Sequence, residues 1–384
     1  MEQLERAKEI LDDVTDRVLA EVPAGAFVFD AHTHLGDDID GMRGRPDEML
    51  AIFDRIGITR SFSFCLDEPD RAPAFTAAND RTLAYAADNP DRIIPFVRLD
   101  LAESPIEEAR RCLDLGARGI KLHPRAQTFS VGDERLDAVF ALAVEREVPI
   151  LIHGGRGLPP IGDHLAALVQ RYEGVRLIIA HAGIADLGGL ARHFAHVPGV
   201  FFDTSVWSIV DLVDLMRQVA PEQVLFATDY PYGRLPNSLL LALRAAKLSH
   251  FDEADVRGML GETAQGIADG APLPTLTEAK GPEAITHPLP LARIHAYIGM
   301  AMPLLWMRMP DVAGGLGLAL NAAHEANIDG VPDADLIRRA LTAASELWAG
   351  IGEIEDRDES ERIARPTRQL VHIADILAVT TPAA

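Results

Sequence analysis

The stretch Phe27-Val28-Phe29-Asp30-Ala31-His32-Thr33-His34-Leu35-Gly36 has the composition of a buried β-strand that ends in polar residues. Its first residues are apolar and β-prone, and Gly36 followed by two aspartates is expected to end the strand. Side chains two residues apart in a strand point to the same face. We therefore expect Asp30, His32 and His34 to share one face. There the two imidazoles can reach one metal ion, although a short His-x-His pattern also occurs by chance.

Seven further apolar segments follow this strand, and helical patterns separate them. The predicted strands are 61–65, 93–97, 119–123, 148–153, 175–181, 200–203 and 224–229. The predicted helices between and after them are 47–56, 76–88, 105–115, 135–147, 163–172, 187–194, 209–219, 238–247 and 253–267. This alternation is typical of an α/β protein with a parallel sheet, and several strands are continuous apolar runs, as in sheets buried on both faces. We predict a closed (β/α)8 TIM-type barrel over residues 26–270, with a doubly wound open sheet as the alternative.

The ends of the chain differ from this central part. Residues 1–25 predict an N-terminal helix, and residues 271–290 are a proline-rich linker. Residues 291–384 predict an all-α C-terminal extension, with helices at 291–309, 314–328, 333–350 and 359–378. Its apolar segment 296–307 is shorter than the ~20 residues that a membrane span needs. We expect this extension to form a homo-oligomer interface or a cap over the pocket.

Composition narrows the range of partners. The chain has 384 residues, is 48% hydrophobic and 24% charged, and carries a net charge of −22. Nucleic acid is not an expected partner, because phosphate binding needs clustered Lys and Arg. The two cysteines, Cys65 and Cys112, form no metal or disulfide pattern, and residues 1–22 do not resemble a signal peptide. We expect a cytoplasmic protein that acts on a small molecule and has no membrane segment.

Polar residues recur at the carboxyl ends of the predicted strands. In a barrel these ends surround a single pocket. A lone histidine at a strand end is more often a hydrogen-bonded wall residue than a ligand, so the joint placement carries the argument. The residues are His32, His34, Lys121, His123, His153, His181 and Asp229.

These segments resemble the amidohydrolase superfamily, and within it the amidohydrolase-2 group, which also contains metal-dependent decarboxylases. The motifs are Asp-Ala-His-Thr-His (30–34), Gly-Ile-Lys-Leu-His-Pro (119–124), Ile-His-Gly-Gly (152–155), Ala-His-Ala-Gly (180–183) and Ala-Thr-Asp-Tyr-Pro (227–231). Each motif is weakly to moderately specific, and together in this order they are specific. The resemblance covers residues 26–270 and does not explain the helical extension.

The resemblance implies one divalent metal ion, with His181 beside it as a catalytic residue. The implied ligands are His32, His34, His153 and Asp229. Three imidazoles and one carboxylate suit zinc, with water completing the site. Asp229 can carry the proton of that water to the leaving group, and His181 can polarise the substrate carbonyl or hold the oxyanion. Asp30 either orients a ligand or forms a hydrogen bond in the barrel floor.

Lys121 is ambiguous. In binuclear members of the superfamily a lysine on strand four is carbamylated and bridges two metals. The Lys-Leu-His-Pro context resembles the mononuclear group instead, so we predict one ion. Lys121, His123, Arg125 and Arg156 then become candidates for binding an anionic substrate group. The alternative for the two arginines is that they are solvated loop charges.

We therefore predict a metal-dependent hydrolase that attacks an ester, lactone or amide carbonyl of a small, carboxylated substrate. A metal-dependent decarboxylase of an aromatic or unsaturated acid is the first alternative, because it would use the same ligands. A non-catalytic binding module is the second, and the complete ligand set argues against it.

Overall fold

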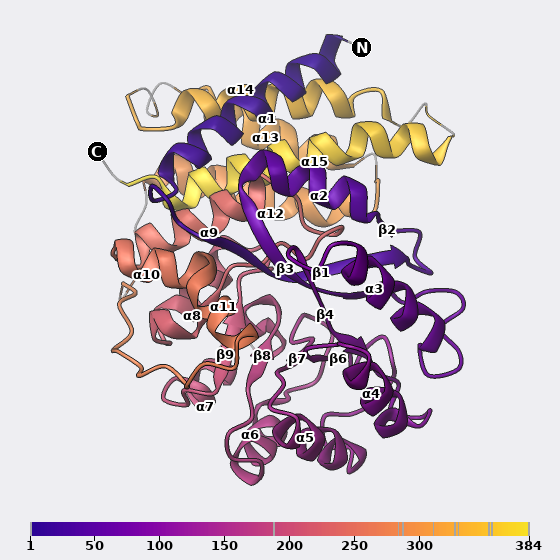
Figure 1. Cartoon of the computed structure of the whole chain (residues 1–384). Helices are drawn as coiled ribbons and strands as arrows, with labels where there is room; N and C mark the ends of the chain where they lie inside the picture. The colour runs from indigo at the N-terminus through magenta and orange to yellow at the C-terminus, as the bar shows by residue number, and fades with distance from the viewer. Residues whose placement is uncertain are drawn as a thin grey trace. The chain divides into compact units, whose positions relative to one another are not determined.

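The computed structural model describes residues 2–186, 189–282, 284–285, 288–309, 311–325, 328, 330–351, 354 and 356–382 (Figure 1). Residues 187–188, residues 326–327 of the helix predicted at 314–328, and residues 283 and 286–287 of the predicted linker 271–290 lie outside this set. The chain divides into two compact units. The barrel unit comprises Pro23–Ser238 and Ser249–Gly281, and the helical unit comprises Met1–Val22, Leu239–Leu248 and Pro282–Ala384.

The barrel unit is built on parallel strands that pair in sequence order. They are β1 (Val28–Asp37), β3 (Ile58–Cys65), β4 (Ile93–Pro95), β5 (Val97–Arg98), β6 (Ile120–Leu122), β7 (Ile150–Ile152), β8 (Leu177–Ile179), β9 (Val200–Asp203) and β10 (Val224–Leu225). β4 and β5 form one strand position interrupted at Phe96, whose N–H still donates to Ser63 O on β3 (2.8 Å). The ring closes where Ala31 N–H donates to Phe226 O (2.9 Å). This closure confirms the predicted (β/α)8 barrel.

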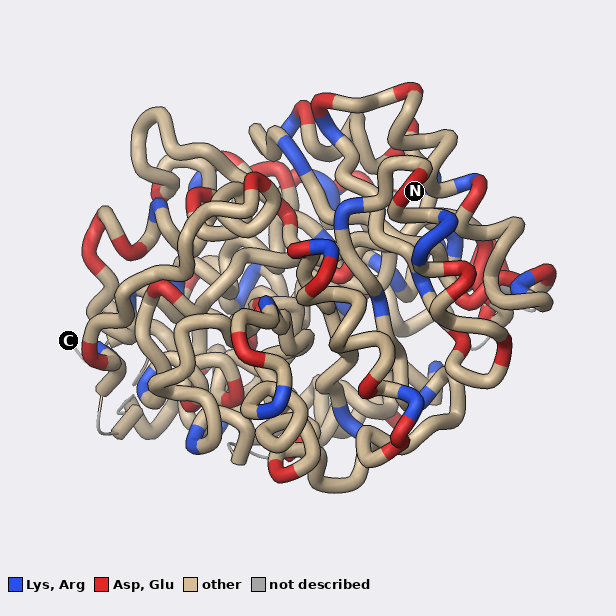
Figure 2. Tube along the Cα trace, turned by 60° about the horizontal axis from the view of Figure 1, so that its bottom comes forward, with Lys and Arg blue, Asp and Glu red and all other residues tan. Residues whose placement is uncertain are grey.

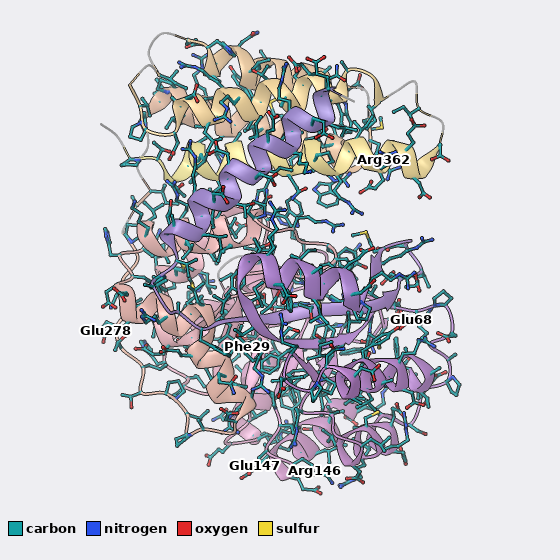
Figure 3. All side chains as sticks on the ribbon, turned by 45° about the horizontal axis from the view of Figure 1, so that its top comes forward. Phe29, Glu68, Arg146, Glu147, Glu278 and Arg362 are labelled. Atoms are coloured by element: carbon teal, nitrogen blue, oxygen red, sulfur yellow. The ribbon has the colours of Figure 1, made fainter. Side chains whose placement is uncertain are left out.

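Alternate residues of the strands fill the inside of the barrel. The ring centroids of Phe29 and Phe62 are 4.7 Å apart, and those of Phe62 and Phe96 are 4.6 Å apart. Figure 3 shows Phe29 inside the barrel unit and Arg146 and Glu147 at its edge. The buried cluster is Phe29, Ala31, Phe62, Phe64, Ile94, Phe96, Leu151, Ile178, Ala180, Phe201, Leu225, Ala227, Ala264 and Ile267. Helices cover the other face of the strands, which explains the continuous apolar runs in the sequence.

Helices follow the strands in turn, as the sequence predicts (Figure 1). They are α2 (Pro46–Ile56), α3 (Thr76–Asp88), α4 (Pro105–Asp114), α5 (Arg135–Glu145), α6 (Gly162–Arg171), α7 (Gly189–Phe194), α8 (Ile209–Met216), α10 (Glu253–Arg257) and α11 (Thr263–Ala268). The short strand β2 (Arg43–Gly44), which pairs antiparallel with Gly36 and Asp37, was not predicted. Because β2 supplies a partner there, β1 runs to Asp37 instead of ending at Gly36.

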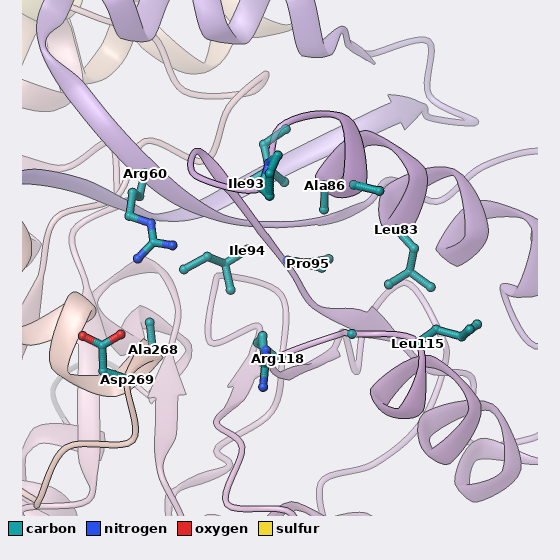
Figure 4. A pocket seen from close by; sticks show the side chains of 13 residues that line it. Arg60, Leu83, Ala86, Ile93, Ile94, Pro95, Leu115, Arg118, Ala268 and Asp269 are labelled. Atoms are coloured by element: carbon teal, nitrogen blue, oxygen red, sulfur yellow. The ribbon is translucent and has the colours of Figure 1, made fainter.

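A cavity of about 510 Å³ lies beside the amino-terminal ends of β3 and β4 (Figure 4). Its polar lining residues include Arg60, Arg118 and Asp269, and its apolar ones include Ile93 and Pro95. TIM-type barrels carry their chemistry at the opposite, carboxyl ends of the strands. The position of this cavity therefore argues against a role in catalysis.

The helical unit is all-α, which confirms the predicted C-terminal extension. Its helices are α1 (Glu2–Glu21), most of α9 (Asn237–Leu248), α12 (Leu289–Trp306), α13 (Val312–Ala323), α14 (Ala334–Trp348) and α15 (Arg357–Thr380). On α12, Met300 and Pro303 are exposed and spaced to share one face, and the exposed Met307 directly follows the helix. A homo-oligomer formed through these helices stays a prediction.

Two surface properties bear on partners. Asp and Glu are interspersed with Lys and Arg along the whole tube in Figure 2, although the net charge is −22. Among the described helices, none combines the length and the apolar character that crossing a membrane requires.

An ion pair between α12 and α15 gives the helical unit a pH dependence. His295 Nδ1 lies 2.7 Å from Asp375 Oδ1, and this hydrogen bond raises the pKa of His295 above its usual 6.5. A raised histidine pKa stabilises the fold fully below the unfolded pKa, and the gain is lost as the pH rises through the folded pKa. We expect His295→Gln to cost about 0.5–1 kcal/mol at pH 6 and less at pH 9. Thermal unfolding of both proteins across this range checks it, and a cost that does not change with pH would contradict it.

Candidate metal centre

A β-bulge in β1 aims its two histidines into the barrel. Asp30 pairs with Ser61 and Thr33 pairs with Ser63, so two residues of β1 oppose one residue of β3. Phe29 and Ala31 point into the core before the bulge, and His32 and His34 point inward after it. The expectation that Asp30 shares their face is wrong, because the bulge inverts the alternation. Burial raises the pKa of Asp30 to about 7, and its carboxylate accepts from the backbone of His32 (3.1 Å) and from Thr228.

Three of the predicted ligands meet at the mouth of the barrel. His32 Nε2 lies 3.1 Å from His34 Nε2 and 3.3 Å from Asp229 Oδ1, and His34 Nε2 lies 3.2 Å from Asp229 Oδ1. Asp229 follows β10, and its N–H donates to His32 O (2.9 Å). Burial holds the pKa of both histidines well below the usual value and raises that of Asp229 well above it. These shifts favour the neutral form of both histidines, which offers a lone pair to a cation.

The position of the ring proton on His32 follows from its other neighbour. Its Nδ1 lies 2.8 Å from Asp203 Oδ2, and both side chains are fully buried. Because a carboxylate accepts, the proton of His32 belongs on Nδ1. Its Nε2 lone pair then faces His34 and Asp229. Oriented in this way by a carboxylate, a histidine is suited to bind metal.

His153 and His181 form a second pair. His181 Nδ1 lies 2.9 Å from the carbonyl of Ser205 and must donate to it, so His181 Nε2 accepts from His153 Nδ1 (3.0 Å). The proton of His153 is thereby assigned to Nδ1, and its Nε2 keeps a lone pair. His153 is not part of the three-atom group, and its ring stacks on His123 with centroids 3.9 Å apart.

Two buried ring nitrogens of predicted ligands have no hydrogen-bond partner within the described part of the chain. They are His153 Nε2 and His34 Nδ1. A buried polar atom without a partner is costly, and such atoms often belong to a functional site. The free lone pair of His153 and the group formed by His32, His34 and Asp229 together fit a divalent ion with mixed imidazole and carboxylate ligands.

Lys121 is fully buried beside this group. Its Nζ lies 3.2 Å from His32 Nε2 and 4.3 Å from the centroid of the Phe64 ring. Burial lowers the pKa of Lys121 to about 7. The amine can therefore be neutral or charged near physiological pH, which is compatible with both roles considered for it.

The other predicted substrate residues lie further out. Arg125 is exposed, and Arg156 is exposed and pairs with Asp211 Oδ2 (2.8 Å). Among the described residues, neither arginine forms a hydrogen bond or ion pair with the site histidines or with Asp229. His123 is half-buried, and its Nδ1 accepts from Ala126 N–H (3.1 Å). His123 therefore joins the site through its stack on His153.

Three residues near the metal-type group, Asp203, Ser205 and Arg98, were not predicted as site residues. Asp203 ends the apolar run of β9, just as Asp229 follows the apolar run of β10. An aspartate at the end of an apolar strand was therefore a pattern by which Asp203 could have been predicted. Arg98 ends β5 and pairs in register with Lys121, and it is only 2% exposed. Its charge acts to lower the pKa of Lys121 and of His34.

The guanidinium of Arg98 has few partners for its five donors. It donates to Cys65 O (3.1 Å) and stacks over the Phe75 ring at 4.9 Å. The Asp67 carboxylate is 4.0 Å away, and Arg98 Nε has no hydrogen-bond partner within the described residues. A buried arginine whose Nε donor is unused, and whose strand neighbour is Lys121, is suited to bind a carboxylate.

Comparisons with known proteins bear on the barrel fold and on the family of this chain. 2,6-dihydroxybenzoate decarboxylase from Rhizobium is similar in structure at 18% identity and a TM-score of 0.50, covering 64% of this chain and 98% of that chain. 5-carboxyvanillate decarboxylase from Sphingomonas paucimobilis matches at 15% identity and 0.50, covering 64% and 99%. No curated protein matches the sequence. A family model described as amidohydrolase matches residues 29–266, more than half of the chain. This chain, with its closed barrel and its His/Asp metal-type group, belongs to the amidohydrolase-2 family.

Proposed function

We propose that this protein is a metal-dependent hydrolase that attacks an ester, lactone or amide carbonyl of a small, carboxylated substrate. The observation that carries the proposal is the convergence of His32 Nε2, His34 Nε2 and Asp229 Oδ1 within 3.3 Å at the mouth of the barrel. His32, His34, His153 and Asp229 would hold one divalent ion, and their mixture of imidazole and carboxylate favours zinc. Such an ion supplies Lewis acidity and lowers the pKa of water to about 7.

Asp229 and His181 divide the proton transfers in this proposal. Burial raises the pKa of Asp229, so its carboxylate can take a proton from the attacking water and release it to the leaving group. The hydrogen bond from His181 Nδ1 to Ser205 O leaves Nε2 of His181 as an acceptor. We therefore assign His181 to accept or orient a proton, and not to polarise the carbonyl.

Arg98 and Lys121 support a carboxylated substrate. They are neighbours in register on β5 and β6, and both are almost completely buried. A buried guanidinium with an unused Nε binds a planar carboxylate through two parallel hydrogen bonds. In this proposal Lys121 stays unmodified and contacts the same anionic group, so the site holds a single ion. Carbamylation of Lys121 in a site with two ions remains the alternative.

Decarboxylation of an aromatic or unsaturated acid is the second candidate function. Two proteins of similar fold are decarboxylases of aromatic acids. The same residues suit that reaction, with Asp229 or His181 delivering a proton to carbon and Arg98 holding a carboxylate. The two functions differ in their products and can be separated directly.

We expect the purified protein to carry about one divalent ion per chain and to lose all turnover when a chelator removes it. The measurement is elemental analysis followed by a screen of carboxylated lactones, esters, amides and aromatic acids in 18O-labelled water. Uptake of 18O into the product supports hydrolysis, and release of carbon dioxide supports the decarboxylase. A protein without a bound ion, which adding zinc or manganese does not change, overturns both.

A further inference from the structure

The carboxylate of Asp203 makes four hydrogen bonds and is completely buried. Oδ2 accepts from His32 Nδ1 (2.8 Å). Oδ1 accepts from three donors, namely His181 N (2.8 Å), Ser205 N (3.0 Å) and Ser205 Oγ (2.5 Å). One oxygen therefore serves a predicted metal ligand, and the other serves the backbone that carries the predicted catalytic histidine.

The three donors on Oδ1 hold the turn that follows β9. Because Ser205 N–H is bound to Oδ1, the carbonyl of Ser205 is held 2.9 Å from His181 Nδ1. The backbone of His181 is bound to the same oxygen. That carbonyl cannot donate, so it places the proton of His181 on Nδ1 and the lone pair on Nε2.

We propose that Asp203 is a positioning residue: its Oδ2 sets the ring proton of His32, and its Oδ1 holds the turn whose Ser205 carbonyl sets the ring proton of His181. The inference rests on the proposed metal centre and deepens it. In this proposal Asp203, at the end of β9, orients His32 so that its Nε2 lone pair faces the ion. It also explains why a strand that supplies no predicted ligand ends in a buried aspartate.

Replacing Asp203 with asparagine is expected to change the contact with His32 while keeping the contacts of Oδ1 with the turn. Two backbone N–H groups require an oxygen at the Oδ1 position, so the amide of Asp203→Asn is expected to keep its oxygen there. Its NH2 group then takes the place of Oδ2 and donates to His32 Nδ1. The proton of His32 must move to Nε2, which removes the lone pair from the ion, while His181 keeps its proton on Nδ1. An aspartate-to-asparagine change that holds a histidine in the wrong tautomer has a known precedent in serine proteases.

The test compares wild type, Asp203→Asn and Ser205→Ala as full-length proteins. Ser205→Ala is the matched control, because it leaves Oδ2 and the Ser205 carbonyl in place. It removes the hydrogen bond from Ser205 Oγ to Oδ1 and the contacts of this hydroxyl with His181 Nδ1 (3.0 Å) and His32 Nδ1 (3.4 Å). Ring-nitrogen NMR of metal-free, 15N-histidine-labelled protein at pH 8 locates each proton, with His32→Gln used for assignment. Competition with a chromophoric chelator measures the zinc Kd.

For Asp203→Asn we expect the proton of His32 on Nε2, that of His181 still on Nδ1, and a zinc Kd weaker by about 10–100-fold. Ser205→Ala should keep both protons on Nδ1 and a Kd close to that of wild type. The assignment is overturned if Asp203→Asn leaves the His32 proton on Nδ1, or if Ser205→Ala weakens zinc binding equally. If the wild-type protein binds no divalent ion, the proposed function fails, whereas the shifted His32 proton still supports the role of Asp203.

Discussion

Replacing Asp229 with asparagine is expected to lower turnover by about 10³-fold or more and to weaken metal binding strongly. Asparagine has nearly the same shape, so the backbone hydrogen bond from Asp229 N–H to His32 O should persist. The variant loses the anionic ligand and the group that carries protons at the same time. We expect the loss of zinc affinity to exceed the ~10–100-fold that removing a supporting partner of a ligand costs.

The metal-free variant should fold, because burying an ionised carboxylate opposes folding and the amide removes that cost. Asp211→Asn is the matched control, since Asp211 pairs with the exposed Arg156 and forms no hydrogen bond to the site histidines in the described chain. It should change turnover less than about twofold. Chelator competition and steady-state kinetics on the substrate found in the screen are the measurements. An Asp229→Asn protein that keeps wild-type affinity for zinc would rule out the ligand assignment.

The fold could be predicted because each barrel strand is a local pattern. An apolar run buried on both faces, followed by a polar residue and a helical segment, is visible in a short window of sequence. Eight successive strand–helix units favoured a closed barrel over a doubly wound open sheet. The short strand β2 was not predictable in this way, since its two residues, Arg43 and Gly44, carry no periodic pattern.

The orientation of Asp30 could not be predicted from the sequence of β1 alone. Strict alternation in β1 places Asp30, His32 and His34 on one face. The structure inserts one extra residue opposite Phe62, so the histidines face inward and Asp30 faces outward. A bulge depends on packing against the neighbouring strand, which the sequence of β1 alone does not contain.

The positions of the charged residues also depend on contacts between strands that the sequence of one strand does not show. Arg156 was a candidate because of its place after strand five, yet it is exposed and paired with Asp211. Arg98 lies inside, because Ile94 and Phe96 set the inward side of its strand and Arg98 continues the same alternation. The pairing of Arg98 on β5 with Lys121 on β6 is why we propose Arg98 in place of Arg156, and such a pairing between strands is not visible in the sequence of either strand.

Replacing Arg98 with methionine is expected to raise KM for the carboxylated substrate by about 30–5,000-fold, with a smaller change in kcat. Methionine fills part of the volume beside Phe75 but offers no donor to an anion. Losing one partner of a buried, charged hydrogen-bonded pair costs about 2–5 kcal/mol. Arg98→Lys should recover only part of the loss, because an ammonium keeps the charge without the planar fork.

If Arg98 has only a structural role, a different result is expected. Comparing two substrates distinguishes this structural role from binding of the substrate carboxylate. If Arg98 only holds Cys65 O and neutralises Asp67, its loss should impair the carboxylated substrate and the carboxamide analogue of that substrate equally. If Arg98 binds the substrate carboxylate, the variant should lose most of the wild-type preference for the acid over the amide. Thermal unfolding of the variant then measures the structural part separately. Equal losses for both substrates would place the anionic group elsewhere and leave Lys121, which is equally buried beside His32, as its binding residue.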